Sequence, residues 1–255
     1  MSLLEFGLLT LAGLGAGLIG SIAGLASLIS YPALLATGLS PVAANVTNTV
    51  ALVLSGVGAV SASRPELTGQ RDRLVRLGAA GLLGGVTGAV LLLLTPAAAF
   101  ERLVPFLIAG ASVAILVQRP PRELAAGGTA AGQRHRVHWG LVLGTFGASV
   151  YAGYFGAAAG VVLLAMYLLV TGEGVPRSNA LKNVVLGLAN GVAAVGYAFF
   201  ADVAWLAALP LAIGFLLGGR LGPRVVRRVP QTLLRRLIAV AGLALAVHLG
   251  LDAFD

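Results

Sequence analysis

The residue with the clearest chemical meaning in this sequence is Lys182, the only lysine in the chain. It lies about seven residues into an apolar run that begins at Val175, directly before Asn183. A charge inside an apolar run is expensive to bury, so two interpretations are open. The long stem carries the ammonium to a polar surface, or the ammonium neutralises an anionic ligand. The acidic residues nearest in sequence, Glu173 and Asp202, fall in turns, so no buried carboxylate relay for protons is predicted.

Lys182 belongs to a block of features that occurs twice in the chain. Each copy has a glycine break, a short apolar stretch with a tyrosine, a turn with glycine and proline, and a run with asparagine. In chain order these residues are Gly24, Tyr31, Gly38, Pro41 and Asn48 in the first copy, and Gly160, Tyr167, Gly172, Pro176 and Asn183 in the second. Such duplication is typical of transporters built from repeated halves.

The composition identifies an integral membrane protein. Of the 255 residues, 58% are apolar and 10% are charged, and the mean hydropathy is +0.96. Soluble domains carry about 25% charged residues, so a large soluble catalytic or nucleic-acid-binding unit is excluded. Arginine-rich cytoplasmic loops explain the formal charge of +8 better than a nucleic-acid partner does. Because the chain has no cysteine, thiolate chemistry and cysteine-ligated metals are excluded, and no metal or cofactor is predicted.

The repetition extends over the whole chain at an offset of 134 to 136 residues. The predicted domains are an N-terminal transmembrane repeat at 1–118, a cytoplasmic linker at 119–137 and a C-terminal transmembrane repeat at 138–255. Glycine and proline divide each repeat into five apolar segments. They cover about 3–22, 24–37, 41–61, 74–94 and 97–117 in the first repeat, and about 138–156, 157–171, 175–200, 203–221 and 232–251 in the second.

The distribution of arginine predicts that the two repeats have opposite orientations. The basic loop follows the third segment in the first repeat (Arg64 to Arg76) but the fourth segment in the second (Arg220 to Arg236). Since basic loops favour the cytoplasm, an odd number of crossings in each repeat places these loops and the linker inside and both termini outside. The predicted fold is an all-α polytopic protein of the cytoplasmic (inner) membrane, with two inverted repeats and eight to ten crossings. Segments 24–37 and 157–171 are short, and either tilted crossings or re-entrant half-helices fit their length.

In inverted repeats the two polar blocks meet near the membrane midplane. Unwound backbone at that depth lines a cavity or is buried in protein, and half-helix N-termini offer N–H groups to an anion. We therefore expect a substrate site built from both blocks. The candidate substrate-binding residues are Gly24, Ser27, Tyr31, Asn45, Thr47, Asn48, Gly160, Tyr167, Asn179, Lys182 and Asn183. For Asn48 and Asn183, packing between helices is the alternative role.

Other glycines and polar residues have simpler explanations. Gly13, Gly17, Gly84 and Gly88 are expected to form small-residue faces for close helix packing. His138 and His248 lie near predicted membrane surfaces and are expected to be structural. Ser21 and His248 are the one conceivable nucleophile and base, but no nucleophile-elbow sequence surrounds Ser21, so an enzyme is not predicted.

The order of these features resembles that of the TauE/SafE sulfite exporter family, over essentially the whole chain. The resemblance is carried by two copies of a glycine-rich stretch, a short helix, a turn (Gly38-Leu-Ser-Pro41 and Gly172-Glu-Gly-Val-Pro176) and a helix with asparagine and threonine. The sequence departs from the family's usual glycine run, which is Gly20-Ser-Ile-Ala-Gly24 and Gly156-Ala-Ala-Ala-Gly160 here. It implies a secondary transporter that exports small sulfur-containing anions, such as sulfite, sulfoacetate or related organosulfonates. An anion channel, or a permease for another small organic anion, is the alternative. We expect the two halves to rock about the shared site; the implied partners are the anion and the lipid bilayer, and no oligomeric state is predicted.

Overall fold

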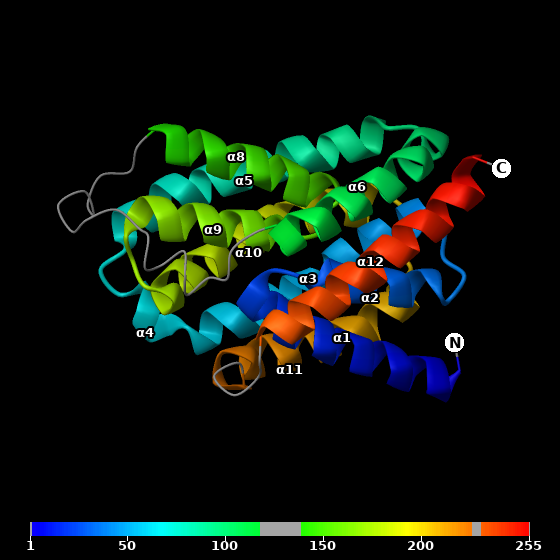
Figure 1. Cartoon of the computed structure of the whole chain (residues 1–255), viewed down its shortest axis with the longest axis horizontal. Coiled ribbons are helices and arrows are strands. Elements are labelled where there is room, and N and C mark those ends of the chain that lie inside the picture. The colour runs from blue at the N-terminus through cyan, green and yellow to red at the C-terminus, as the bar shows by residue number, and fades with distance from the viewer. Residues whose placement is uncertain (1, 118–138, 226–230, 255) are drawn as a thin grey trace.

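The computed structural model describes residues 2–117, 139–225 and 231–254, and over these residues it is built from helices and short turns (Figure 1). The predicted linker at 119–137 and His138 lie outside the described residues, as do Arg227 and Arg228 of the second basic loop. The all-α prediction is therefore confirmed for the described part of the chain.

The described helices correspond to the predicted apolar segments, with one addition. In the first half they are α1 (Leu3–Ala23), α2 (Ser27–Leu35), α3 (Pro41–Ala62), α4 (Arg64–Leu67), α5 (Arg71–Leu94) and α6 (Ala97–Val117). In the second half they are α8 (Trp139–Tyr154), α9 (Ala159–Thr171), α10 (Val175–Phe200), α11 (Trp205–Val225) and α12 (Gln231–Phe254). The addition is the one-turn helix α4, whose sequence Arg-Pro-Glu-Leu has no apolar run that hydropathy detects.

Local sequence explains where the helices begin and end. The α1 helix begins with a capping box, in which the Ser2 hydroxyl accepts from the Glu5 N–H and the Glu5 carboxylate accepts from the Ser2 N–H. It ends at Gly24, whose φ of +76° is a left-handed conformation that glycine adopts without strain. The α3 helix has Ser40 as its N-cap and Pro41 in its first turn, where proline loses no hydrogen bond.

Six of the described helices have a stretch that is long and apolar enough to cross a membrane. The stretches are Leu3–Ala23, Pro41–Ala62, Arg71–Leu94, Ala97–Ala114, Val175–Phe200 and Trp205–Gly222. The α2 helix has only nine residues and α9 has 13, which correspond to about 14 and 20 Å of helix against about 30 Å of hydrocarbon. Their lengths favour half-helices over full crossings.

The most extensive helix pairs join the two halves of the chain. The α1 helix packs along α11, and α5 packs along α8. Further pairs are α3 with α11, α10 with α5, α6 with α12, and α3 with α10, so the halves interlock (Figure 1). As a result, both hydrophobic clusters found among the described residues, a larger one around Tyr31 and Phe155 and a smaller one around Leu77 and Leu163, combine residues of both halves.

Glycine faces make the closest of these contacts possible, as predicted. A methyl carbon added to Gly17 of α1 would lie 2.8 Å from the Phe215 carbonyl oxygen of α11. One added to Gly84 of α5 would lie 2.5 Å from the Phe146 carbonyl oxygen of α8. Because no side chain fits between these backbones, the glycines set how closely the helices approach.

The outward faces of the helices are apolar. Leu11 on α1, Leu143 on α8 and Leu209 on α11 are large side chains with exposed fractions of 65%, 65% and 59%. A soluble protein rarely exposes so extensive an apolar surface, and lipid is the solvent that accommodates it. The structure therefore agrees with a multi-pass membrane protein.

Candidate functional site

The two glycine breaks lie against each other inside the molecule. A methyl carbon added to Gly160, in the first turn of α9, would lie 2.5 Å from the Cα atom of Gly24, at the end of α1. Ala158, just before α9, has a φ of +59° and marks the second break. The structure thus brings the two repeated blocks together, and α2 and α9 both begin within a few residues of this contact.

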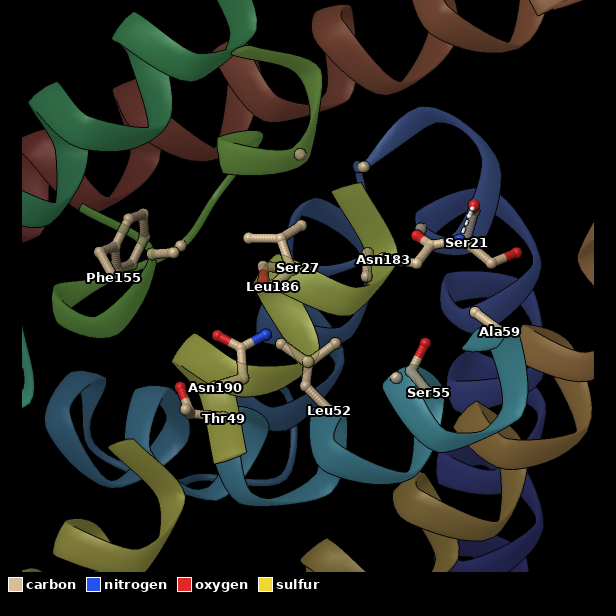
Figure 2. A pocket seen from close by; sticks show the side chains of 18 residues that line it. Ser21, Ser27, Thr49, Leu52, Ser55, Ala59, Phe155, Asn183, Leu186 and Asn190 are labelled. Carbon is tan, nitrogen blue, oxygen red and sulfur yellow. Dashed lines mark hydrogen bonds between the residues drawn. The ribbon is translucent and has the colours of Figure 1, made fainter. Parts of the chain in front are cut away.

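A cavity of about 60 Å³ lies beside the contact of the breaks (Figure 2). Its walls come from the end of α1, the start of α2, the end of α8 with the second break, and the facing sides of α3 and α10. Hydroxyl and amide groups supply its polar surface, and Leu52, Phe155 and Leu186 its largest apolar side chains. The polar side chains in the lining are Ser21, Ser27, Thr49, Ser55, Asn183 and Asn190.

Four of the candidate residues line this cavity: Gly24, Ser27, Gly160 and Asn183. Asn48 lies behind Ser27, because its Nδ2 atom donates to the Ser27 hydroxyl oxygen at 3.2 Å. Its Oδ1 atom accepts from the Ser30 hydroxyl at 2.6 Å. Asn48 therefore holds Ser27 in place and is not itself in the lining.

Lys182 is buried at the end of α1. Its side chain has an exposed fraction of 0%, and Nζ donates to the carbonyl oxygens of Gly20 (3.2 Å) and Ser21 (3.4 Å). The interpretation that Lys182 reaches a polar surface is therefore wrong. The ion pairs found in the described part of the chain, Arg73–Glu173 and Arg177–Glu173, do not involve it. The last carbonyls of a helix are the negative end of its dipole, so Lys182 caps α1 from another helix.

Two amides on the same face of α10 bind the same helix end. The Nδ2 atoms of Asn179 and Asn183 donate to the Ser21 carbonyl oxygen at 2.9 and 3.1 Å. The dashed line in Figure 2 marks the bond from Asn183. Residues spaced by three and four positions share one face of a helix, which explains the convergence of this pair with Lys182. Gly20 and Ser21, which Lys182 binds, line the cavity, so the ammonium lies directly behind its wall.

The end of α8 has a related but uncharged partner. The Nδ2 atom of Asn45 on α3 donates to the Tyr154 carbonyl oxygen at 2.9 Å. Thr47, which aligns with Lys182 in the repeat, instead accepts from the Ala204 N–H at 3.0 Å, in the turn between α10 and α11. Each long central helix thus caps the first helix of the other half, but only α10 does so with a charge.

The two tyrosines of the repeated blocks are packing residues. Tyr31 donates to the Pro41 carbonyl oxygen at 3.4 Å and packs edge-on against Phe155, with 5.4 Å between ring centroids. The Tyr167 hydroxyl lies 3.2 Å from the Thr145 hydroxyl oxygen. Both are buried outside the cavity lining. The candidates outside the lining are therefore Tyr31, Asn45, Thr47, Asn48, Tyr167, Asn179 and Lys182.

Sequence reasoning missed several lining residues that a helical pattern could have found. Asn183, Leu186, Gly187 and Asn190 follow the spacing of one face of α10. Asn190 could have been found by extending that face from Asn183. Ser21 was considered as a nucleophile, but its hydroxyl donates to the Leu18 carbonyl oxygen at 3.0 Å. Ser21 and His248 line separate cavities, so the geometry gives no support to a hydrolase.

Comparisons with known proteins identify a family of membrane transporters. The family described as "Sulfite exporter TauE/SafE" matches residues 9–249. The "Probable membrane transporter protein YfcA" of Escherichia coli K12 is 26% identical over 260 residues, which cover 99% of this chain and 92% of the relative. The "Probable membrane transporter protein ORF9" of Sinorhizobium sp is 27% identical over 241 residues, or 93% and 89% of the two chains.

A "Probable membrane transporter protein" of Haemophilus influenzae is 27% identical over 249 residues, which cover 94% of this chain and 92% of the relative. No solved structure matches the chain significantly. The family match extends over both breaks, the cavity and nearly all described helices. The chain therefore belongs to the TauE/SafE sulfite exporter family of membrane transporters.

Proposed function

We propose that the protein is a secondary transporter that exports a small sulfur-containing anion, with the cavity at the two breaks as its substrate site. The observation that carries this proposal is the cavity itself. It lies between two helix breaks and is lined by hydroxyl and amide groups, and the buried ammonium of Lys182 lies behind its wall. Among the described residues that line it, none is a carboxylate.

The charges around the cavity favour an anion. The end of a helix carries about half a negative charge, so the α1 carbonyls offset only part of the Lys182 charge. The N-termini of α2 and α9 add partial positive charge on the same cavity, where Ser27 and Gly160 lie in their first turns. In a low-dielectric interior this surplus acts strongly on a bound ion.

The size of the cavity favours the smaller of the expected substrates. A cavity needs about 10 to 15 Å³ to hold one water, so 60 Å³ holds roughly four to six non-hydrogen atoms. Sulfite has about four non-hydrogen atoms and fits this volume, whereas sulfoacetate has about eight and exceeds it. With a single buried lysine nearby, a monoanion is also easier to compensate than a dianion. Protonated sulfite is therefore our first candidate, and the larger sulfonates are second.

The inverted-repeat arrangement is part of the same proposal. In the repeat, α1 corresponds to α8, α3 to α10, and α5 to α11. The packed pair α1 with α11 then corresponds to α8 with α5, and α3 with α11 corresponds to α10 with α5. All four pairs occur in the structure. In Figure 1, α1 runs away from the end that carries both termini, whereas α8 runs toward it. The eight to ten crossings expected from the sequence are part of this proposal: α8 and α12 would cross in addition to the six helices with long apolar stretches, and α2 and α9 as tilted helices would complete ten.

The same arrangement supports the proposed sidedness. The α4 helix and the start of α5, with Arg64 and Arg71, lie at the end of the molecule opposite the two termini (Figure 1). Basic loops favour the cytoplasm, so the termini are proposed to be outside a bacterial-type inner membrane. A negative-inside potential contributes about 2.3 kcal/mol per charge per 100 mV to the export of an anion, and export therefore needs no coupling ion.

The test is efflux of labelled sulfite from proteoliposomes that contain the purified protein, with Asn183→Ala beside the wild type. We expect saturable efflux that excess sulfite inhibits, that acetate spares, and that Asn183→Ala lowers at least about tenfold, or about 1.4 kcal/mol. A wild type that moves neither sulfite nor a sulfonate contradicts the proposal. Single-channel conductance in a planar bilayer would instead establish the channel alternative.

A further inference from the structure

Eight of the described helices form two bundles, each of which combines helices of both sequence halves, while α6 and α12 pack mainly on each other. Bundle A comprises α1, α2, α3 and α11, because α11 packs along both α1 and α3. Bundle B comprises α5, α8, α9 and α10, because α5 packs along both α8 and α10. The short helices α2 and α9 contact the long helices of their own bundles. In this division, each bundle takes three helices from one half and one from the other (Figure 1).

Each bundle is held together by contacts between backbones. In bundle A, a methyl carbon added to Gly219 of α11 would lie 2.6 Å from the Ser55 carbonyl oxygen of α3. In bundle B, one added to Gly85 of α5 would lie 2.5 Å from the Ala189 carbonyl oxygen of α10. Tyr197 of α10 also donates to the Gly153 carbonyl oxygen of α8. Interdigitated backbones resist sliding, since any shift along the axis drives one chain into the other.

The two bundles meet at a much smaller set of contacts. The α3 and α10 helices cross where a methyl carbon on Gly56 would lie 3.1 Å from the Cα atom of Gly187. The second close approach is that of Gly24 and Gly160, described above. All four glycines line the cavity, so the substrate site lies at the junction of the bundles. Close approaches between α1 and α11 recur along both helices, from Gly13 to Gly222, whereas the junction of the bundles has these two, so a small rotation at the junction displaces fewer contacts.

The polar contacts near the cavity also join one bundle to the other. Lys182, Asn179 and Asn183 of bundle B bind the last carbonyls of α1 in bundle A. Asn45 of bundle A binds the Tyr154 carbonyl of α8 in bundle B. These hydrogen bonds lie at helix ends, four at the end of α1 and one at the end of α8, and each donor can exchange its carbonyl partner for water or for an anion.

We propose that bundles A and B, and not the two sequence halves, are the bodies that move against each other during transport. This inference rests on the proposed transport function. Rocking of the halves would require α1 to slide along α11 and α5 along α8, which are the most closely packed pairs. Movement of bundle A against bundle B leaves those pairs intact and opens the cavity at the junction where it lies.

The test measures distances between pairs of spin labels with and without saturating sulfite, in the full-length protein in lipid nanodiscs. The chain contains no cysteine, so labels can be placed singly without background. Suitable sites are Leu11 on α1, Leu83 on α5, Leu143 on α8 and Leu209 on α11, whose exposed fractions lie between 58% and 65%. Labels there face lipid and leave the cavity residues unchanged.

The four sites give opposite patterns for the two divisions. If the bundles move, the pairs Leu11/Leu209 and Leu83/Leu143 keep their distances, while Leu11/Leu83 and Leu143/Leu209 change by more than about 2 Å. If the halves move, the constant pairs and the changing pairs are exchanged, and the inference is overturned. Uniform change in all pairs, or none in any pair, also overturns it.

Flux of sulfite through the same labelled proteins separates this inference from the proposed function. If labelled protein transports sulfite but the distances Leu11/Leu209 and Leu83/Leu143 change, only the inference that the bundles are the moving bodies is refuted. Unlabelled protein that transports no sulfite or sulfonate refutes the proposed function, whatever the distances do. Transport with the expected pairing supports both.

Discussion

Lys182 on α10 donates a hydrogen bond to the carbonyl oxygen of Gly20 on α1, at a distance of 3.2 Å and a separation of 162 residues. The bond places the only lysine of the chain at the negative end of a helix, directly behind a wall of the cavity. Carbonyl groups, and no carboxylate, accept the hydrogen bonds of the ammonium, so part of its positive charge is left to act on a substrate. The first prediction separates the role of Lys182 in capping α1 from its role in attracting the anion.

Lys182→Met is expected to lower sulfite transport at least about tenfold, or about 1.4 kcal/mol, because the cavity loses the buried ammonium behind its wall. Thermal stability in detergent should be unchanged or higher, since replacing a buried charge by an apolar side chain of similar length is often neutral or stabilising. Arg177→Met is the matched control, as Arg177 is a partly exposed cation on the first turns of the same helix. Full transport by Lys182→Met would show that the lysine only caps α1.

Asn179→Ala and Asn183→Ala separate helix capping from substrate binding. Both amides donate to the Ser21 carbonyl oxygen, so each variant should lose about 1 kcal/mol of stability. Only Asn183 lines the cavity, and only its removal should lower the rate of sulfite efflux. Equal loss of efflux in both variants would mean that the position of α1, and not contact with the anion, limits transport.

Gly160→Ala is expected to destabilise the protein by about 1 to 3 kcal/mol, because the added methyl group overlaps the Gly24 backbone. Gly191→Ala on α10 is the control, since an added methyl carbon there has no atom within 4 Å. That variant should be neutral or slightly more stable, as alanine favours a helix. Thermal unfolding of the two variants side by side checks the prediction, which fails if Gly160→Ala is as stable as Gly191→Ala.

Leu186→Ala should enlarge the cavity and relax its selection for size. Leu186 supplies part of the apolar wall, and its truncation removes three carbon atoms. Sulfoacetate transport should rise relative to sulfite transport by roughly threefold or more, as expected when a pocket loses a steric limit. Val195→Ala, an exposed position on the same helix, should leave the ratio unchanged. An unchanged ratio in Leu186→Ala would show that this wall does not set the size limit.

Glu173→Gln should destabilise the end of the molecule where α5 and α10 begin. The Glu173 carboxylate accepts from Arg73 at 2.8 Å, and Arg73 has an exposed fraction of only 8%. Leaving that guanidinium unpaired should cost about 2 to 3 kcal/mol in the free energy of unfolding. Asp72→Asn, at an exposed neighbouring position, is the control, and Arg73→Met should recover most of the loss in the double variant. No loss in Glu173→Gln would mean that water solvates Arg73.

Much of the fold could be predicted from the sequence because the features concerned are local. Composition establishes a membrane environment, and glycine and proline mark the helix ends, such as Gly24 and Pro41. The recurrence of Asn48 as Asn183 predicts a duplication without any structural information. Each of these patterns lies within one segment of the sequence or between a segment and its repeated copy, so no knowledge of helix packing is needed to see it.

Only the tertiary structure decided which polar residues face the cavity. Lys182 and Asn183 are adjacent in sequence, but successive residues of a helix point about 100° apart, so small differences in helix rotation decide which one lines a site. Rotation depends on the partner helices, and the repeat alignment did not reveal that Thr47 would turn away toward Ala204. Asn190 lies on the same face of α10 as Asn183, so its place in the lining follows by spacing once the rotation of α10 is known.

The pairing of helices was also a matter of tertiary structure. Gly17 and Gly84 predict that another backbone approaches closely, but a glycine has no side chain that would identify which helix packs against it. Partner choice depends on the fit of whole helix faces from distant parts of the chain. The sequence by itself thus determined the membrane environment and the helix ends and predicted the repeats, while long-range packing decided how the halves interlock and where the cavity lies.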